Sequence, residues 1–394
     1  MTPIARFAAA AEVLDRWLGG TPAERALTDW ARGARYAGSG DRAAVRDHVY
    51  EVLRRYGTCR AAAGFGEDEP QAIDGRALIL GLVRLGQRDP ANVFTGEGHA
   101  LAPLSAAERA REPLDFDPER NVPAWLRPAL KDRFGAAYAA FLDTQGVRAP
   151  VWLRVNLRRA RRDEVVAALV AERIEATGAE SCTTAIMVSA GERKLRQATA
   201  YCDGLVEPQD LSVQIAIAET AWPLSGKILD YCAGGGGKAL ALADRTDARV
   251  YAHDAVPRRM ADLQPRADRA GVRITELSTD ALDREGPFDL VLTDVPCSGS
   301  GTWRRDPEAK WRLTPERLEE LITLQAEILD AAARLVGPGG RLVYMTCSLL
   351  RAENEAQIDS FHDRHSGWQT LSNRQDTPLT ASDGFFSATL SRSN

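Results

Sequence analysis

The sequence is poor in the residues that form disulfide frameworks and metal sites. Its 394 residues include 6 cysteines and 5 histidines. No two cysteines form a C-x-x-C pair, and no histidine stands near them at metal-ligand spacing. We therefore expect free thiols in a reducing compartment, and neither a zinc site nor any other bound metal.

Long hydrophobic runs are also absent. No apolar run approaches the roughly eighteen residues that a membrane-spanning helix needs. The first residues lack the charged and apolar regions of a secretory signal. We expect a cytoplasmic protein that has no membrane partner, and we expect it to be a monomer.

An excess of positive charge is missing as well. The net charge of −5 and the pI near 5.7 argue against a protein that coats nucleic acid without specificity. The stretch from Gly146 to Ala200, however, carries ten Arg and Lys against six Asp and Glu. This local excess indicates either a surface that contacts RNA phosphates or an ordinary solvated helix start.

The length of the chain predicts two or three domains. Residues 1–87 carry apolar residues at helical spacing and predict an all-α domain. Residues 88–122 contain scattered prolines and acids, which is typical of a linker. Residues 123–210 predict a small α+β unit, and residues 211–394 predict a larger α/β domain.

Local signals set the predicted helix ends in the first domain. Thr21 to Glu24 has the form of a capping box with proline at the first helical position. A helix that starts at Asp41 is predicted to end at Gly57, and a later helix lies near Arg76 to Leu85. These segments together predict a compact helical unit.

Short apolar strands alternate with helices from Leu211 onward. The predicted strands are 228–230, 250–253, 273–277, 290–293 and 342–346, and the longest predicted helix is 315–335. This alternation predicts a mainly parallel, doubly wound, Rossmann-like sheet. Ligands of such sheets bind at the carboxyl ends of the strands.

A glycine-rich loop follows the first of these strands. Residues 227–238 read Lys-Ile-Leu-Asp-Tyr-Cys-Ala-Gly-Gly-Gly-Gly-Lys. Glycine permits positive φ and close approach of a ligand, and the following helix start offers free N–H groups. A phosphate-binding P-loop is excluded because Cys232 and Ala239 stand where that motif needs a glycine and a hydroxyl. A dinucleotide site and an S-adenosylmethionine site both fit the pattern.

Two later strands are followed by cysteines. Asp294 and Cys297 lie in a Gly/Ser-rich stretch after strand 290–293, and Cys347 directly follows strand 342–346. A thiolate that adds to C6 of a pyrimidine makes C5 nucleophilic, and a second thiol and a neighbouring acid can then assist product release. The pair therefore favours methylation of a pyrimidine at C5.

Several motifs occur in the order typical of one enzyme family. They are the run from Asp294 to Trp311, the Thr-Cys-Ser element at 346–348 with Glu353-Asn354, the loop 229–238 and the segment 209–214. Together they resemble the RsmB/Nop/Sun RNA 5-methylcytosine methyltransferases, and most closely the bacterial branch that modifies small-subunit ribosomal RNA. The resemblance implies a class I methyltransferase domain preceded by an RRM-like RNA-binding unit and a NusB-like helical domain.

The resemblance also implies roles for individual residues. It implies that Cys347 is the nucleophile, that Cys297 assists release and that Asp294 lies between cofactor and target base. The implied S-adenosylmethionine-binding residues are Cys232, Ala233, Gly234, Gly235, Gly236, Gly237, Lys238, Asp254, Arg259, Asp280 and Asp294. The implied RNA-binding residues are Arg154, Asn156 and Lys238.

Some alternatives stay open at the level of the sequence. DNA cytosine methyltransferases use a Pro-Cys cysteine as nucleophile, so Cys297 and Cys347 could have exchanged roles. The RNA could be ribosomal, which we favour, or transfer RNA. A nicotinamide-dependent oxidoreductase fits the glycine pattern alone, and a non-catalytic ribosome-assembly factor fits the N-terminal helices. Gly234 and Gly235 replace an Ala-Pro pair of the family, which predicts weaker cofactor binding because the loop is looser.

Overall fold

The computed structural model describes residues 1–67 and 73–392. It divides the chain into two compact units, Met1–Arg148 with Trp303–Arg312, and Ala149–Thr302 with Leu313–Asn394. This division differs from the predicted one. Residues 88–122 belong to the first unit instead of forming a linker, and ten residues from the C-terminal half of the chain belong to it as well.

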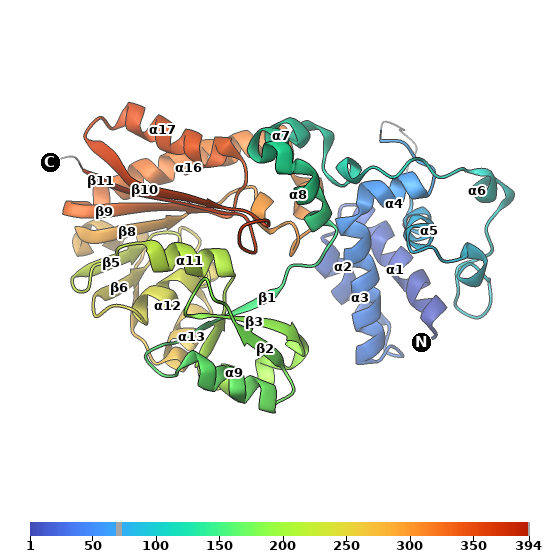
Figure 1. Cartoon of the computed structure of the whole chain (residues 1–394), viewed down its shortest axis with the longest axis horizontal. Helices are drawn as coiled ribbons and strands as arrows, with labels where there is room; N and C mark the ends of the chain where they lie inside the picture. Colours follow the sequence, from blue (N-terminus) through green and yellow to red (C-terminus); the bar gives the residue numbers. More distant parts are fainter. Residues whose placement is uncertain (68–72, 393–394) are drawn as a thin grey trace. The chain divides into compact units, whose positions relative to one another are not determined.

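The first unit is all-α, as the apolar spacing predicts (Figure 1). Its helices are α1 (Pro3–Leu18), α2 (Ala23–Gly33), α3 (Ser39–Arg54), α4 (Tyr56–Ala62), α5 (Gly75–Leu85), α6 (Ala106–Ala110), α7 (Arg127–Phe134), α8 (Tyr138–Gln145) and α15 (Ala309–Arg312). Helix α1 starts where Thr2 Oγ1 accepts a hydrogen bond from the amide of Ala5 at 3.3 Å and Pro3 takes the first helical position.

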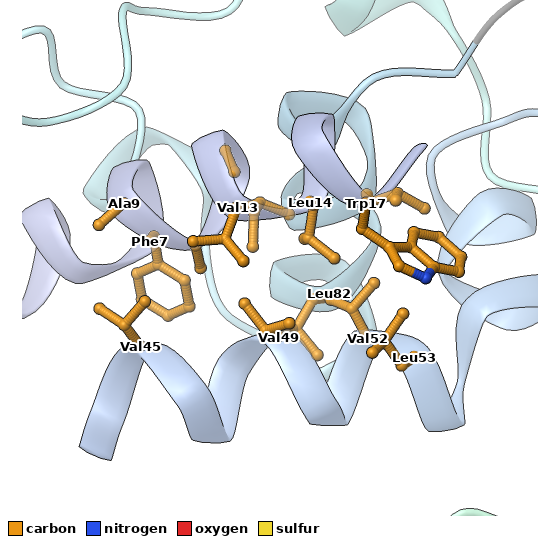
Figure 2. Close-up of a cluster of buried hydrophobic side chains, with 14 of the residues drawn as sticks. Phe7, Ala9, Val13, Leu14, Trp17, Val45, Val49, Val52, Leu53 and Leu82 are labelled. Carbon is orange, nitrogen blue, oxygen red and sulfur yellow. The ribbon is translucent and has the colours of Figure 1, made fainter. Parts of the chain in front are cut away.

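Helices α1, α3 and α5 enclose the core of this unit (Figure 2). The apolar face of α1 points toward that of α3, and α5 closes the cluster. The side chains are Phe7, Ala9, Val13, Leu14 and Trp17 from α1, Val45, Val49, Val52 and Leu53 from α3, and Leu82 from α5. Their burial stabilises the unit by roughly 1.5–3 kcal/mol for each large side chain.

Gly57 shows why the segment 88–122 is not a linker. The prediction that Gly57 ends a helix is wrong, since it lies inside α4. A Cβ at Gly57 would lie 1.6 Å from the carbonyl oxygen of Arg120, so only glycine lets these two backbones meet. The amide of Thr58 also donates to Asn121 Oδ1 at 3.1 Å. The proline-rich segment is therefore packed onto α4.

Residues 303–312 are held inside the first unit by contacts with its helices. Lys310 Nζ donates to the carbonyl oxygen of Arg54 at 3.1 Å, and Trp311 Nε1 donates to that of Leu53 at 2.8 Å. Glu308 accepts a hydrogen bond from the amide of Ala23 at 2.8 Å. The predicted capping box at Thr21 is therefore wrong, because a carboxylate distant in sequence caps α2 instead.

The second unit contains two sheets. The smaller one joins β1 (Val151–Val155), β2 (Glu175–Gly178), β3 (Ala185–Ala190) and β4 (Val206–Pro208) in the order β2-β3-β1-β4. All of its pairings are antiparallel, and α9 (Arg162–Ala171) lies between β1 and β2 in sequence. The predicted small α+β unit is thus present, with β2 as a strand that the sequence pattern missed.

The larger sheet has the order β10-β11-β9-β8-β5-β6-β7. Its strands are β5 (Lys227–Asp230), β6 (Arg249–Ala252), β7 (Ile274–Glu276), β8 (Phe288–Asp294), β9 (Val336–Thr346), β10 (Trp368–Asp376) and β11 (Phe385–Arg392). The pairings from β7 to β9 are parallel, and β11 pairs antiparallel with both β9 and β10. The parallel strands were all predicted, whereas β10 and β11 were not.

Both faces of this sheet are covered, which confirms the doubly wound α/β fold. A cluster of buried hydrophobic side chains lies on each face of the sheet. Ile228 of β5 packs into the first cluster, and its neighbour Leu229 packs into the second. Helices α11 (Leu211–Glu219), α12 (Gly237–Ala243) and α13 (Leu263–Ala270) contribute to the first cluster. Helices α16 (Pro315–Leu335) and α17 (Glu355–Arg364) contribute to the second.

Candidate active site

The glycine loop lies at the carboxyl end of β5, as predicted. Gly234 and Gly236 adopt φ values of 50° and 80°, which non-glycine residues rarely take. A Cβ at Gly236 would lie 2.0 Å from Leu263 Cδ1, so this position needs glycine for close packing as well. The loop then enters α12 at Gly237.

A cavity of about 320 Å³ opens over this loop. This volume lies within the range of about 300–1,000 Å³ that is typical of small-molecule sites. The lining residues are Pro208, Gln209, Val213, Asp230, Cys232, Ala233, Gly234, Gly235, Gly237, Lys238, Arg266 and Asp294. Most residues predicted to bind the cofactor through the loop therefore line one cavity.

Acidic residues follow the neighbouring strands at the same edge. Asp254 follows β6 and is 6% exposed. Its Oδ2 accepts from the amide of Gly234 at 3.1 Å, and its Oδ1 accepts from that of Val256 at 2.8 Å. Arg259 lies 3.9 Å from the same carboxylate, and Asp280 is exposed in the turn after β7. The predicted acids thus lie along the carboxyl edge of the sheet.

Asp230 is a site residue to which the sequence analysis gave no role. It ends β5, is 1% exposed and lines the cavity. Burial raises the pKa of Asp230 to about 7, with Lys238 acting against the increase and Asp294 adding to it. The sequence signal that could have identified Asp230 is its position, since it is an acid at the end of the strand that precedes the glycine loop. Gln209 and Arg266 also line the cavity without a predicted cofactor role.

Lys238 and Asp294 form an ion pair at the cavity wall. Burial lowers the pKa of Lys238, but the attraction of Asp294, Asp230 and Cys347 raises it more, and the net change is an increase. Lys238 therefore stays protonated at neutral pH. Its ammonium group is a fixed positive charge within electrostatic reach of both Asp294 and the sulfur of Cys347.

The two strand-end cysteines lie together, with their sulfur atoms 3.3 Å apart. Hydrogen bonds between the two loops join them, since Val295 donates to the carbonyl oxygen of Met345 at 3.0 Å and Gly301 to that of Cys347 at 2.9 Å. The hydrogen bond with Cys347, burial and the charge of Glu353 raise the pKa of Cys297 well above its usual value. Cys297 is therefore held as a thiol, which can donate a hydrogen bond to the other sulfur.

Arg154 and Asn156, which the resemblance implies bind RNA, are buried within the second unit. Arg154 is 2% exposed and pairs with Asp244, and Asn156 is 4% exposed and donates to the carbonyl oxygen of Ala270 at 2.8 Å. Both side chains are thus used inside the second unit, where they fasten the small sheet to helices α12 and α13 of the large one.

The remaining cysteines lie in different surroundings. Cys59 and Cys182 are buried, whereas Cys202 is exposed. Cys232 lines the cavity, and burial raises the pKa of its thiol. Among residues 1–67 and 73–392, no cluster of His, Cys, Asp and Glu has the form of a metal site. No helix in this part of the chain is long and apolar enough to cross a bilayer.

Comparison with known proteins places this geometry in a family. Residues 223–390 match the model of the 16S rRNA methyltransferase RsmB/F, and residues 122–192 match the ferredoxin-like domain of RsmF/B-like methyltransferases. The ribosomal RNA small subunit methyltransferase B of Vibrio vulnificus is 30% identical over 86% of this chain and 86% of its own length. The chain belongs to the RsmB/F family of methyltransferases. The Vibrio cholerae protein of the same name is 29% identical over 89% of this chain and 90% of its own length.

Solved structures show the same fold as this RsmB/F family member. The protein PH0851 superposes with a TM-score of 0.78 at 24% identity, over 100% of this chain and 99% of its own. NSun6 from Pyrococcus horikoshii, solved with SFG, gives a TM-score of 0.60 at 18% identity, over 69% of this chain and 98% of its own. The second unit therefore has the Rossmann-like methyltransferase fold that the strand pattern predicts.

Proposed function

We propose that this RsmB/F family enzyme methylates C5 of cytosine in small-subunit ribosomal RNA, with S-adenosylmethionine as methyl donor. The observation that carries the proposal is the pair of sulfur atoms 3.3 Å apart, on the loops after β8 and β9, next to the cavity of the glycine loop. A dinucleotide-dependent oxidoreductase has no use for this pair. The family's role in modifying ribosomal RNA favours that substrate over transfer RNA.

The cavity residues suit the proposed methyl donor. The loop from Cys232 to Lys238 lines the cavity, and at Gly234 its backbone groups are accessible because glycine has no Cβ. Asp230 adds a buried carboxylate to the cavity lining. Asp254 holds the loop amide at Gly234, and we assign the ribose contact to it, with Arg259 beside it. We assign Asp280, in the turn after β7, to a further cofactor contact. When bound, S-adenosylmethionine would supply an electrophilic methyl group at the open side of this loop.

The two cysteines have different roles in the reaction, Cys347 as nucleophile and Cys297 as proton donor. The Cys347 thiolate adds to C6, and the electron pair released to C5 takes the methyl group. The proton on C5 then passes to water, and the electron pair of its C–H bond restores the C5–C6 double bond as the bond between C6 and the Cys347 sulfur breaks. Cys297 remains a thiol near the Cys347 sulfur and can protonate it as it departs. Asp294, held by Lys238, lines the cavity three residues before Cys297 and would orient the base.

We further propose that the all-α first unit is NusB-like and that the small antiparallel sheet is an RRM-like RNA-binding unit. The ferredoxin-like match at 122–192 and the strand order β2-β3-β1-β4 support the second assignment. The protein would act in the cytoplasm as a monomer, on a base that has left its stack to reach the pocket.

Trapping the covalent intermediate tests the proposed roles. Cys347→Ala should abolish the protein–RNA adduct on a denaturing gel, because no thiolate can add to C6. Cys297→Ala should let the adduct accumulate, because release is slowed. The reverse pattern would mean that the two cysteines have exchanged roles. Bisulfite mapping of ribosomal and transfer RNA from cells with and without the protein would identify the substrate, and a full biological effect of Cys347→Ala would support a non-catalytic assembly factor instead.

A further inference from the structure

Glu353 connects the two cysteine loops although it lies in neither. It belongs to the turn after β9 and is fully buried, at 0% exposure. One carboxylate oxygen accepts from the amide of Ser298 at 2.7 Å and from Gln325 Nε2 at 3.0 Å. The other accepts from the hydroxyl groups of Ser298 and Ser348. One carboxylate thus binds the residue that follows Cys297 and the residue that follows Cys347.

Neighbours of Glu353 hold the residues that precede the cysteines. Gln325 Nε2 also donates to the carbonyl oxygen of Pro296 at 2.9 Å. Asn354 accepts from Thr346 Oγ1 at 2.6 Å and donates to the carbonyl oxygen of Ser348 at 2.9 Å. Each cysteine is therefore fixed on both sides by buried polar groups that converge on the turn at Glu353.

A buried carboxylate is a costly way to stabilise a fold. The donors to Glu353 described above are amides and hydroxyls, which are uncharged. Taking an ionised carboxylate out of water costs several kcal/mol, which neutral hydrogen bonds offset only in part. An apolar residue would pack two loops at lower cost, so the position of Glu353 points to a requirement of the cysteine site.

We propose that Glu353 is a positioning residue that sets the separation of the Cys297 and Cys347 sulfur atoms through Ser298 and Ser348. This inference rests on the proposed function for its significance, but the geometry that it describes exists in the free protein. The charge of Glu353 has a second effect, because it contributes to the raised pKa of Cys297 and so helps keep that thiol protonated.

A dithiol reagent tests the geometry without RNA or methyl donor. Phenylarsine oxide condenses with two adjacent thiols, forming two As–S bonds and releasing one water without a redox change. The full-length protein should bind phenylarsine oxide tightly. The Cys347→Ser variant measures how much of the reagent binds to the other cysteines. Glu353→Ala should weaken binding about tenfold or more, because loss of a charge-assisted hydrogen-bond hub frees both loops.

Two further variants keep the test decisive if Glu353→Ala does not fold. Ser348→Ala removes one link to Glu353 and should weaken arsenical binding to a lesser degree. Glu353→Gln keeps the length of the side chain without its charge, so it should retain binding while Cys297 becomes alkylated at lower pH in a Cys347→Ser background. Asp244→Asn is the matched control, since it alters a buried carboxylate that pairs with Arg154 and should leave arsenical binding unchanged.

Turnover gives the second readout. Glu353→Ala should lower kcat for methyl transfer at least tenfold, with KM for RNA little changed. Folded Glu353→Ala and Ser348→Ala variants that bind the arsenical as tightly as the wild type would overturn the proposal. If instead Cys347→Ala left the covalent RNA adduct intact, the proposed function would fail while the arsenical result would still stand.

Discussion

At the scale of single residues, the site is governed by charges that burial has brought close together. Asp230, Asp294 and Lys238 line one cavity, and Lys238 is the cation that balances the two acids. Cys347 feels the same ammonium group, while Cys297 feels the negative charge of Glu353. The two thiols are thus in different electrostatic surroundings although their sulfur atoms are neighbours, which is what two different catalytic roles require.

Asp230 should make stability depend on pH. Its pKa of about 7 lies above the ordinary value of 3.8, so the folded protein binds more protons than the unfolded chain between those values. Stability from this group is present below about pH 4 and is lost as pH rises through 7. Asp230→Asn should therefore raise the free energy of unfolding at pH 8, by up to a few kcal/mol, and leave it unchanged near pH 4. Urea titrations at both pH values check this, and an equal gain at both would contradict it.

Arg154 should prove structural when it is removed. Arg154→Ala leaves Asp244 as a buried unpaired carboxylate, which typically costs about 3–5 kcal/mol. We expect a lower Tm in thermal unfolding and no specific loss of RNA affinity when binding is measured well below that Tm. A selective loss of RNA affinity with Tm unchanged would restore the original prediction of an RNA contact.

At the scale of elements, the ten residues Trp303–Arg312 do not belong with the strand that precedes them. They follow β8 and the Cys297 loop in sequence, yet their partners are the ends of α2 and α3. Trp303 and Lys310 are each 1% exposed, so both side chains are fully buried. A motif that is read as one continuous run in the sequence is divided between two units of the structure.

Lys310 gives this segment a testable pH dependence. Burial lowers the pKa of Lys310 to about 7 from its ordinary 10.5, so the unfolded chain binds the extra proton between those values. The buried ammonium group of Lys310 therefore destabilises the folded protein by its full amount below about pH 7, and this destabilisation disappears as pH rises toward 10.5. Lys310→Met should unfold at a higher temperature than the wild type at pH 6, and the difference should shrink by pH 10. A difference that grows with pH would show that Lys310 is not buried as a cation.

At the scale of the whole molecule, the chain passes between the two units more than once. The first unit takes its polypeptide from Met1–Arg148 and again from Trp303–Arg312, and the second takes the remainder. The catalytic unit is therefore not an independent C-terminal half. The residues directly after the Cys297 loop depend on the first 148 residues for their packing.

Truncation should expose this dependence. A chain of residues 149–394 lacks the first unit's core, against which Trp311 packs, and separates the segment Trp303–Arg312 from the rest of its unit. Exposed aromatic surface promotes association. We expect this fragment to sediment as aggregates, whereas the same fragment with Trp303→Ser and Trp311→Ser should be more monomeric. Analytical ultracentrifugation at equal concentrations compares the two, and a fully monomeric unmodified fragment would contradict the prediction.

The sequence by itself determined the α/β fold, the glycine loop and the two strand-end cysteines, because strand periodicity and turn residues are local signals. It failed where packing between distant segments decides. It did not show that Arg154 pairs with Asp244, ninety residues away. Residues 88–122 had the composition of a linker, but Arg120 packs directly against Gly57 of α4. The 3.3 Å approach of the two sulfur atoms and the convergence of both loops on Glu353 were likewise decided only by tertiary structure. Such contacts join residues far apart in the chain, and no local pattern records which of them will meet.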